Sequence, residues 1–148
     1  MANNTDFQRR DFIKQTCRLC AATVGLAAVL PALSSCAPLQ TITAEVKPGG
    51  IIEVPLTSFA TDNPLVIVHN AALEYEIALV RYSDQTYKAF EMKCTHRDNP
   101  LVATKSGFFC NLHGSSFDIN GKVVKSPATN NLKQYNLQVT DPLILIKI

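Results

Sequence analysis

The sequence predicts a small, all-β domain built from antiparallel strands. From Ile51 onward, short apolar runs rich in β-branched and aromatic residues alternate with turn residues. No segment after the first 36 residues shows convincing helical periodicity. A length of 148 residues suits one such domain with an appendage. We therefore divide the chain into a leader (1–36), a linker (37–50) and a β domain (51–148).

The strands are expected where the apolar runs lie. Turn-forming residues separate them at Thr61–Pro64, Ser83–Gln85 and Asp141–Pro142. Gly107–Phe109 is a further short apolar strand. The other expected strands are Ile51–Leu56, Leu65–His69, Tyr75–Tyr82, Tyr87–Met92, Gly121–Val124, Leu132–Thr140 and Leu143–Ile148.

The net charge of +2 belongs to the leader. Four of the fourteen basic residues but only two of the twelve acidic residues lie in the first eighteen positions, so the rest of the chain is neutral. A neutral domain lacks the basic surface that nucleic-acid binding needs. The composition therefore excludes a nucleic-acid partner.

The leader resembles a twin-arginine export signal. Arg9 and Arg10 are followed by an aromatic residue, an aliphatic residue and Lys14. The run Leu19–Leu33 then holds fifteen uncharged residues, a typical length for the core of a signal peptide. It is shorter than the ~20 residues that span a bilayer. The resemblance implies export of a protein that folds, with any cofactor, before it crosses the membrane.

The end of the leader resembles a lipobox. Leu33 is followed by two serines and Cys36, so the resemblance implies cleavage before Cys36 and lipidation of its thiol. An uncleaved signal anchor is the alternative. Cys17 and Cys20 have C-x-x-C spacing but lie inside the signal, where small apolar filler is the expected role.

Two half-motifs carry the candidate chemistry. Cys94 and His96 form C-x-H, and Cys110 and His113 form C-x-x-H after thirteen intervening residues. Each half offers one thiolate and one imidazole, on a loop beside an apolar strand. A Cys2His2 zinc site and a Cys94–Cys110 disulfide remain as alternatives. The third histidine, His69, has no cysteine near it in sequence and is expected to be structural or exposed.

These half-motifs resemble those of the Rieske iron–sulfur proteins, and with them the fold is expected to be Rieske-like, with cluster-binding loops. The resemblance implies a [2Fe–2S] cluster with Cys94 and Cys110 on the inner iron and His96 and His113 on the outer iron. It also implies that Ser115 donates a hydrogen bond to a bridging sulfide. Ser126–Ala128 resembles the proline loop that covers the cluster.

Two differences separate the chain from Rieske proteins of cytochrome bc complexes. Neither the stretch Arg97–Leu101 nor Leu112 supplies the extra cysteines that form a disulfide there, and Phe117 stands where high-potential members have tyrosine. These differences argue against membership of a quinol-oxidising complex.

The resulting functional hypothesis is a single-electron transfer protein outside the cytoplasm. It is expected to be a free carrier or an oxidoreductase subunit rather than a complete enzyme, with another redox protein as its partner. A lipid on Cys36, or a signal anchor, would hold it on the periplasmic side of a membrane. The alternative is a zinc- or disulfide-stabilised exported lipoprotein with a binding role.

Overall fold

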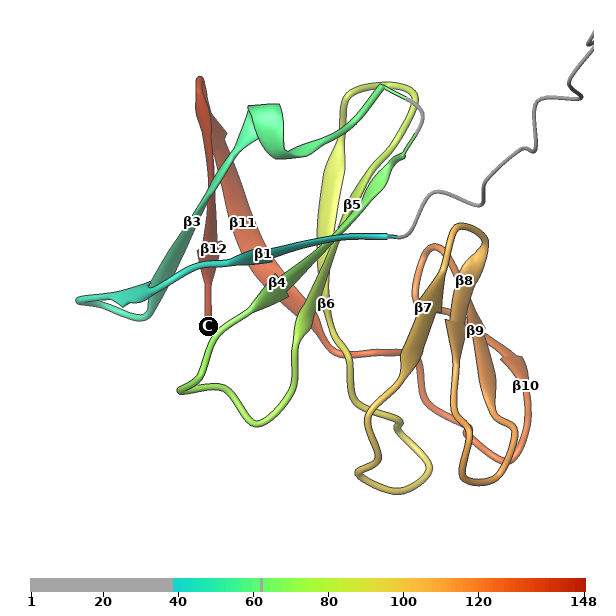
Figure 1. Cartoon of the computed structure of the whole chain (residues 1–148). Helices are drawn as coiled ribbons and strands as arrows, with labels where there is room; N and C mark the ends of the chain where they lie inside the picture. The colour runs from blue at the N-terminus through green and yellow to red at the C-terminus, as the bar shows by residue number, and fades with distance from the viewer. Residues whose placement is uncertain (1–38, 62) are drawn as a thin grey trace, which may run out of the picture. The chain divides into compact units, whose positions relative to one another are not determined.

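A computed structural model describes residues 39–61 and 63–148, and Figure 1 shows their arrangement. The predicted all-β fold is confirmed: the described chain is built of strands and one short 3-10 turn, η1 (Leu56–Ser58). The strands are β1 (Gln40–Thr43), β2 (Val46–Lys47), β3 (Ile51–Pro55), β4 (Leu65–His69), β5 (Ile77–Arg81), β6 (Tyr87–Glu91), β7 (Val102–Thr104), β8 (Gly107–Phe109), β9 (Ser116–Asp118), β10 (Val123–Lys125), β11 (Gln134–Thr140) and β12 (Leu143–Lys147).

The larger sheet has eight strands in the order β1-β4-β5-β6-β11-β12-β3-β2. All neighbours pair antiparallel except β1 and β4, which run parallel. The alternating side chains of β3 and β12 bury Ile52 and Val54 against Ile144 and Ile146. Successive side chains of a strand point to opposite faces of the sheet, so one face of these strands is buried and the other is partly exposed.

β4 and β5 are buried on both faces and separate two hydrophobic cores. Val66 and Leu79 belong to the core enclosed by the larger sheet. Leu65 and Val80 belong to a second core, which lies between these strands and the smaller sheet. Because both faces are covered, β4 and β5 read as continuous apolar runs rather than as alternating ones.

The smaller sheet has four strands in the order β10-β9-β8-β7 (Figure 1). Phe108 and Phe117 face each other across β8 and β9 and are buried in the second core. The ring of Phe90 on β6 meets Phe108 edge-on at 6.0 Å between centroids, which joins the two sheets. Gly121 allows this approach, because a Cβ there would lie 2.7 Å from Phe90.

The structure differs from the sequence prediction at several strand boundaries. The expected linker 37–50 contributes β1 and β2, whose strand state comes from backbone pairing rather than from buried apolar residues. The strand expected to begin at Gly121 begins at Val123, because Gly121 closes a turn by donating its N–H to the Asp118 carbonyl. Leu132 precedes β11 but is buried in the second core.

Within residues 39–61 and 63–148, no helix is long and apolar enough to cross a membrane. The predicted leader, including Arg9, Arg10 and Cys36, lies outside the described residues.

Candidate metal centre

Two loops carry the predicted ligands, and their backbones close in the same way. Loop 1 (residues 94–99) follows β6, and loop 2 (residues 110–115) connects β8 to β9. The N–H of Cys94 donates to the carbonyl of Asn99 at 2.9 Å, and the N–H of Cys110 donates to the carbonyl of Ser115 at 2.9 Å. In loop 2, Gly114 has φ +77°, a left-handed conformation that glycine adopts without strain. Each cysteine therefore starts a tight loop of equal length.

The two cysteines in these loops are free thiols buried in the second core. Cys94 and Cys110 are each 1% exposed. Burial raises the pKa of the Cys110 thiol. Hydrogen bonds from the backbone of Leu112, from Cys94, from the backbone of His113 and from Asn99 outweigh this effect and lower the pKa overall. A lowered pKa makes the Cys110 thiol easier to deprotonate, and the thiolate is the form that binds metal.

The two histidines of the motif lie next to each other. Their ring centroids are 4.9 Å apart, and the rings are nearly perpendicular at 83°. His113 is exposed, whereas His96 is half-buried. Nδ1 of His96 is the only buried side-chain nitrogen or oxygen in the described chain without a hydrogen-bond partner. Such an atom costs about 1–3 kcal/mol, and coordination of a metal ion would remove that cost.

Ser115 is fully buried and links loop 2 to a third loop (residues 126–131). Its Oγ accepts a hydrogen bond from the N–H of Ala128 at 3.0 Å. A hydroxyl oxygen that accepts still has its own proton to donate. No hydrogen bond of the described chain uses the Ser115 hydroxyl as donor, so the side chain suits the donor role that the sequence predicts.

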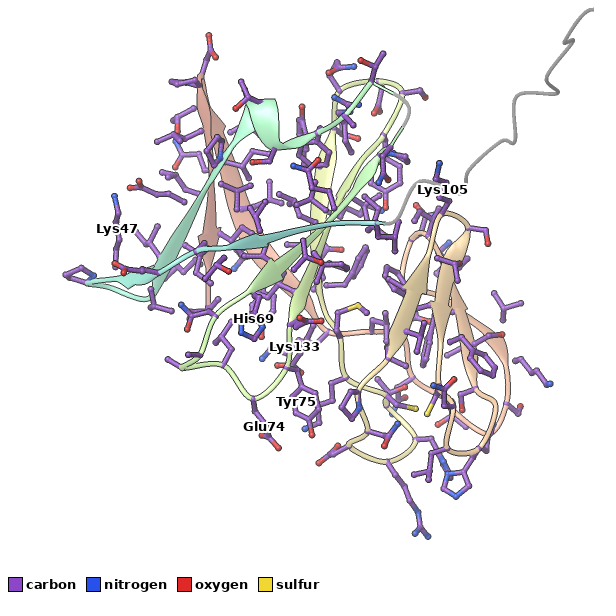
Figure 2. All side chains as sticks on the ribbon, viewed as in Figure 1. Lys47, His69, Glu74, Tyr75, Lys105 and Lys133 are labelled. Carbon is purple, nitrogen blue, oxygen red and sulfur yellow. The ribbon has the colours of Figure 1, made fainter. Side chains whose placement is uncertain are left out.

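Further polar contacts hold the loops in place. Thr95 Oγ1 donates to the carbonyl of Asn130 at 2.6 Å, which ties loop 1 to the third loop. Tyr75 donates its hydroxyl to the carbonyl of Asp98 at 2.9 Å, and Figure 2 shows its ring in the segment before β5. Lys93 forms an ion pair with Asp98 at 3.1 Å. Sequence reasoning missed these residues. Thr95 and Tyr75 contact segments far apart in the chain, and the local Lys93–Asp98 pair has no motif that marks it.

The four candidate side chains lie as two pairs, the thiol of Cys94 with that of Cys110 and the imidazole of His96 with that of His113. Within the described ranges, no group of three or more His, Cys, Asp or Glu side chains converges on a single point. His69 is elsewhere, at the end of β4, where its Nδ1 lies 3.3 Å from Glu76 (Figure 2). The prediction that His69 has no part in the motif agrees with this placement.

Comparison with known proteins identifies the family. Residues 54–136, more than half of the chain, match the model of the Rieske [2Fe-2S] domain. The chain is 42% identical over 57 residues to the cytochrome b6-f complex iron-sulfur subunit of Prochlorococcus marinus (strain MIT 9515), across 36% of this chain and 32% of that one. It thus spans about a third of the length of the curated relatives it matches.

Two solved structures share the fold. One is a chain from the complex of reduced oxygenase and oxidized ferredoxin in carbazole 1,9a-dioxygenase, with TM-score 0.51 and 20% identity over 67% of this chain and 94% of that one. The other is naphthalene 1,2-dioxygenase with indole bound in the active site, with TM-score 0.52 and 22% identity over 66% of this chain and 25% of that one. The match to the family model covers both half-motifs and Ser115. Because it spans more than half of the chain, the chain belongs to the Rieske [2Fe-2S] domain family.

Proposed function

We propose that this protein transfers single electrons through a [2Fe–2S] cluster held by Cys94 and Cys110 on one iron and by His96 and His113 on the other. One observation carries the proposal. Two buried thiols and two adjacent imidazoles, one with an unpaired buried nitrogen, lie on neighbouring loops of a Rieske domain. Two pairs of different ligands suit a cluster whose irons differ in ligand type.

The protein's residues divide the work at such a site. The family's cluster supplies one-electron chemistry, at about −150 to +300 mV. The thiolates of Cys94 and Cys110 would add negative charge at the buried end of the cluster, while the neutral imidazoles of His96 and His113 would add none at the other end. The hydroxyl of Ser115 would donate a hydrogen bond to a sulfur atom of the cluster, which favours the reduced state.

The exposed histidine indicates through which side of the domain electrons enter and leave. Both cysteines are covered by apolar side chains, whereas His113 is open to solvent. A partner's redox centre therefore approaches most closely on the histidine side. We infer that a redox protein docks there, and that the chain acts as a carrier or as a subunit of a larger oxidoreductase.

The leader supports a location outside the cytoplasm. Arg9 and Arg10, the uncharged run and Cys36 fit twin-arginine export followed by lipidation or, in the alternative, an uncleaved anchor. We propose that the domain faces the periplasm while its N-terminal side is fixed to a membrane. Lysines in place of Arg9 and Arg10 should leave the precursor in the cytoplasm, and Cys36→Ala should abolish lipid labelling. An exported chain with intact residues 1–35 and no lipid would favour the anchor.

The cluster assignment is tested by analysis of the purified, anaerobically prepared protein. We expect two irons and two sulfides per chain, and a Rieske-type paramagnetic signal after reduction. Cys94→Ser and His96→Gln should remove that signal. The matched control is His69→Gln, which changes a histidine outside the loops and should leave the signal intact. Stoichiometric zinc without iron would contradict the proposal.

A further inference from the structure

Asn99 contacts both cysteine loops at once. Its carbonyl accepts the N–H of Cys94 at 2.9 Å, and its amide nitrogen Nδ2 lies 3.8 Å from Sγ of Cys110. Nδ2 also donates to the carbonyl of Pro100 at 3.0 Å. A side-chain amide has two N–H hydrogens, so both donations can be made together. In the described chain, this is the one side-chain amide within hydrogen-bond distance of a cysteine sulfur.

The backbone of Asn99 is held in place, and its side chain is anchored to that backbone by the hydrogen bond from Nδ2 to the Pro100 carbonyl. Pro100 restricts the conformation of the residue before it to extended geometry. It also forms a β-bridge with Lys93, which immediately precedes loop 1. Together with the bond to the N–H of Cys94, this holds Asn99 from both sides. The amide is therefore preorganised toward Cys110, a residue of the other loop.

We propose that Asn99 is a positioning residue that links the two cysteine loops and raises the reduction potential of the cluster by donating a hydrogen bond to the Cys110 sulfur. The inference rests on the proposed function, because it assumes that Cys110 binds iron. Reduction places more negative charge on the sulfur atoms. A donor aimed at sulfur consequently stabilises the reduced state more than the oxidised state.

The test is a redox titration of the full-length protein with its cluster, followed by paramagnetic resonance. Asn99→Leu keeps a similar size and removes the donor, and Asn99→Asp keeps the shape but replaces the donor with an anion. We expect the equilibrium constant for one-electron reduction to fall at least about threefold in Asn99→Leu, and further in Asn99→Asp. A tenfold fall corresponds to about 59 mV.

Two further variants make the result specific. Asn111→Leu changes an exposed asparagine directly after Cys110 whose side chain makes no hydrogen bond in the described chain, and its potential should equal that of the wild type. Asn99→Gln retains an amide donor and should recover part of the loss. Loss of the cluster from the Leu and Asp variants, with retention in Asn99→Gln, also supports the bridging donor.

The contrary outcomes are distinct. Potentials of Asn99→Leu and Asn99→Asp equal to the wild type, or an equal fall in Asn111→Leu, overturn the role of Asn99 and leave the proposed function standing. Loss of the cluster from Asn99→Gln as well overturns a donor-specific role. A wild-type protein without a Rieske signal overturns the proposed function itself, and the inference with it.

Discussion

Six of the eight strands in the larger sheet have five or more residues, whereas all four strands of the smaller sheet have three. The core of the larger sheet consists of hydrophobic side chains and includes the buried Tyr135. The smaller sheet and loops, which we call the cluster lobe (residues 94–131), rest on a core that includes two thiols. One region is stabilised by apolar burial, while the other depends also on polar links and on its cofactor.

Removing iron gives the largest expected difference between the two regions. Chelation of the reduced protein should cost the cluster lobe its amide protection in hydrogen exchange at β8 and β9, because the loops lose their central ligand. Amides of β4 and β5 should stay protected. Simultaneous loss of protection in both regions would show that the regions unfold as one unit.

Gly121→Ala tests the packing between the lobe and the larger sheet. A Cβ at Gly121 would meet the ring of Phe90 at 2.7 Å, and the residue has φ +73°. We expect a loss of about 2–3 kcal/mol in the free energy of unfolding, measured with urea, from overpacking and backbone strain. Gly49→Ala is the control, because Gly49 has φ +90° but nothing within 4 Å. An equal loss in both variants would remove packing as the cause.

Glu91→Gln tests a polar contact between the end of β6 and the start of β11, two central strands of the larger sheet. Burial raises the pKa of Glu91, but hydrogen bonds from Tyr135 at 2.8 Å and Lys133 at 3.0 Å outweigh it and lower the pKa overall. A lowered pKa stabilises the folded protein above the unfolded pKa, and that stability is lost as pH falls through the folded value. The free energy of unfolding of the wild type should therefore exceed that of the variant by about 1–2 kcal/mol at neutral pH. This difference should disappear at acidic pH.

The control for this pH dependence is Glu45→Gln. Glu45 is exposed and makes no ion pair or side-chain hydrogen bond in the described residues. Urea unfolding of the control should follow the wild type at each pH. A gap between Glu91→Gln and the wild type that persists unchanged in acid would contradict the proposed charge effect.

Tyr75→Phe has the smallest expected effect. It removes one hydrogen bond to loop 1 from the segment before β5, worth about 0.5–1.5 kcal/mol. Loop 1 amides should exchange several-fold faster, while those of β11 and β12 remain unchanged. Tyr87→Phe is the matched control, because no hydrogen bond of the described chain uses the Tyr87 hydroxyl. Faster exchange in both variants would mean that the contact with Asp98 is not responsible.

The sequence predicts the strands of the larger sheet better than the polar contacts that hold the loops of the cluster lobe. Runs such as Leu65–His69 are local signals, and the structure confirms them. Cys94, His96, Cys110 and His113 were also found from local spacing, and the structure brings them together, although their role as ligands stays a prediction. Their supports could not be predicted, because contacts such as Thr95 with Asn130 depend on the folded path of the chain.

The equal closures of loops 1 and 2 also divide this part of the chain into segments that tolerate changes of length and segments that do not. An insertion between Cys94 and Asn99, or between Cys110 and Ser115, breaks the backbone hydrogen bond that closes the loop and positions the cysteine sulfur. The tip of the β7–β8 hairpin, at Lys105 and Ser106, does not position a cysteine. Figure 2 places Lys105 at the end of the smaller sheet away from these loops. That tip is thus a natural place for insertions among homologues and for grafting a label or an affinity tag.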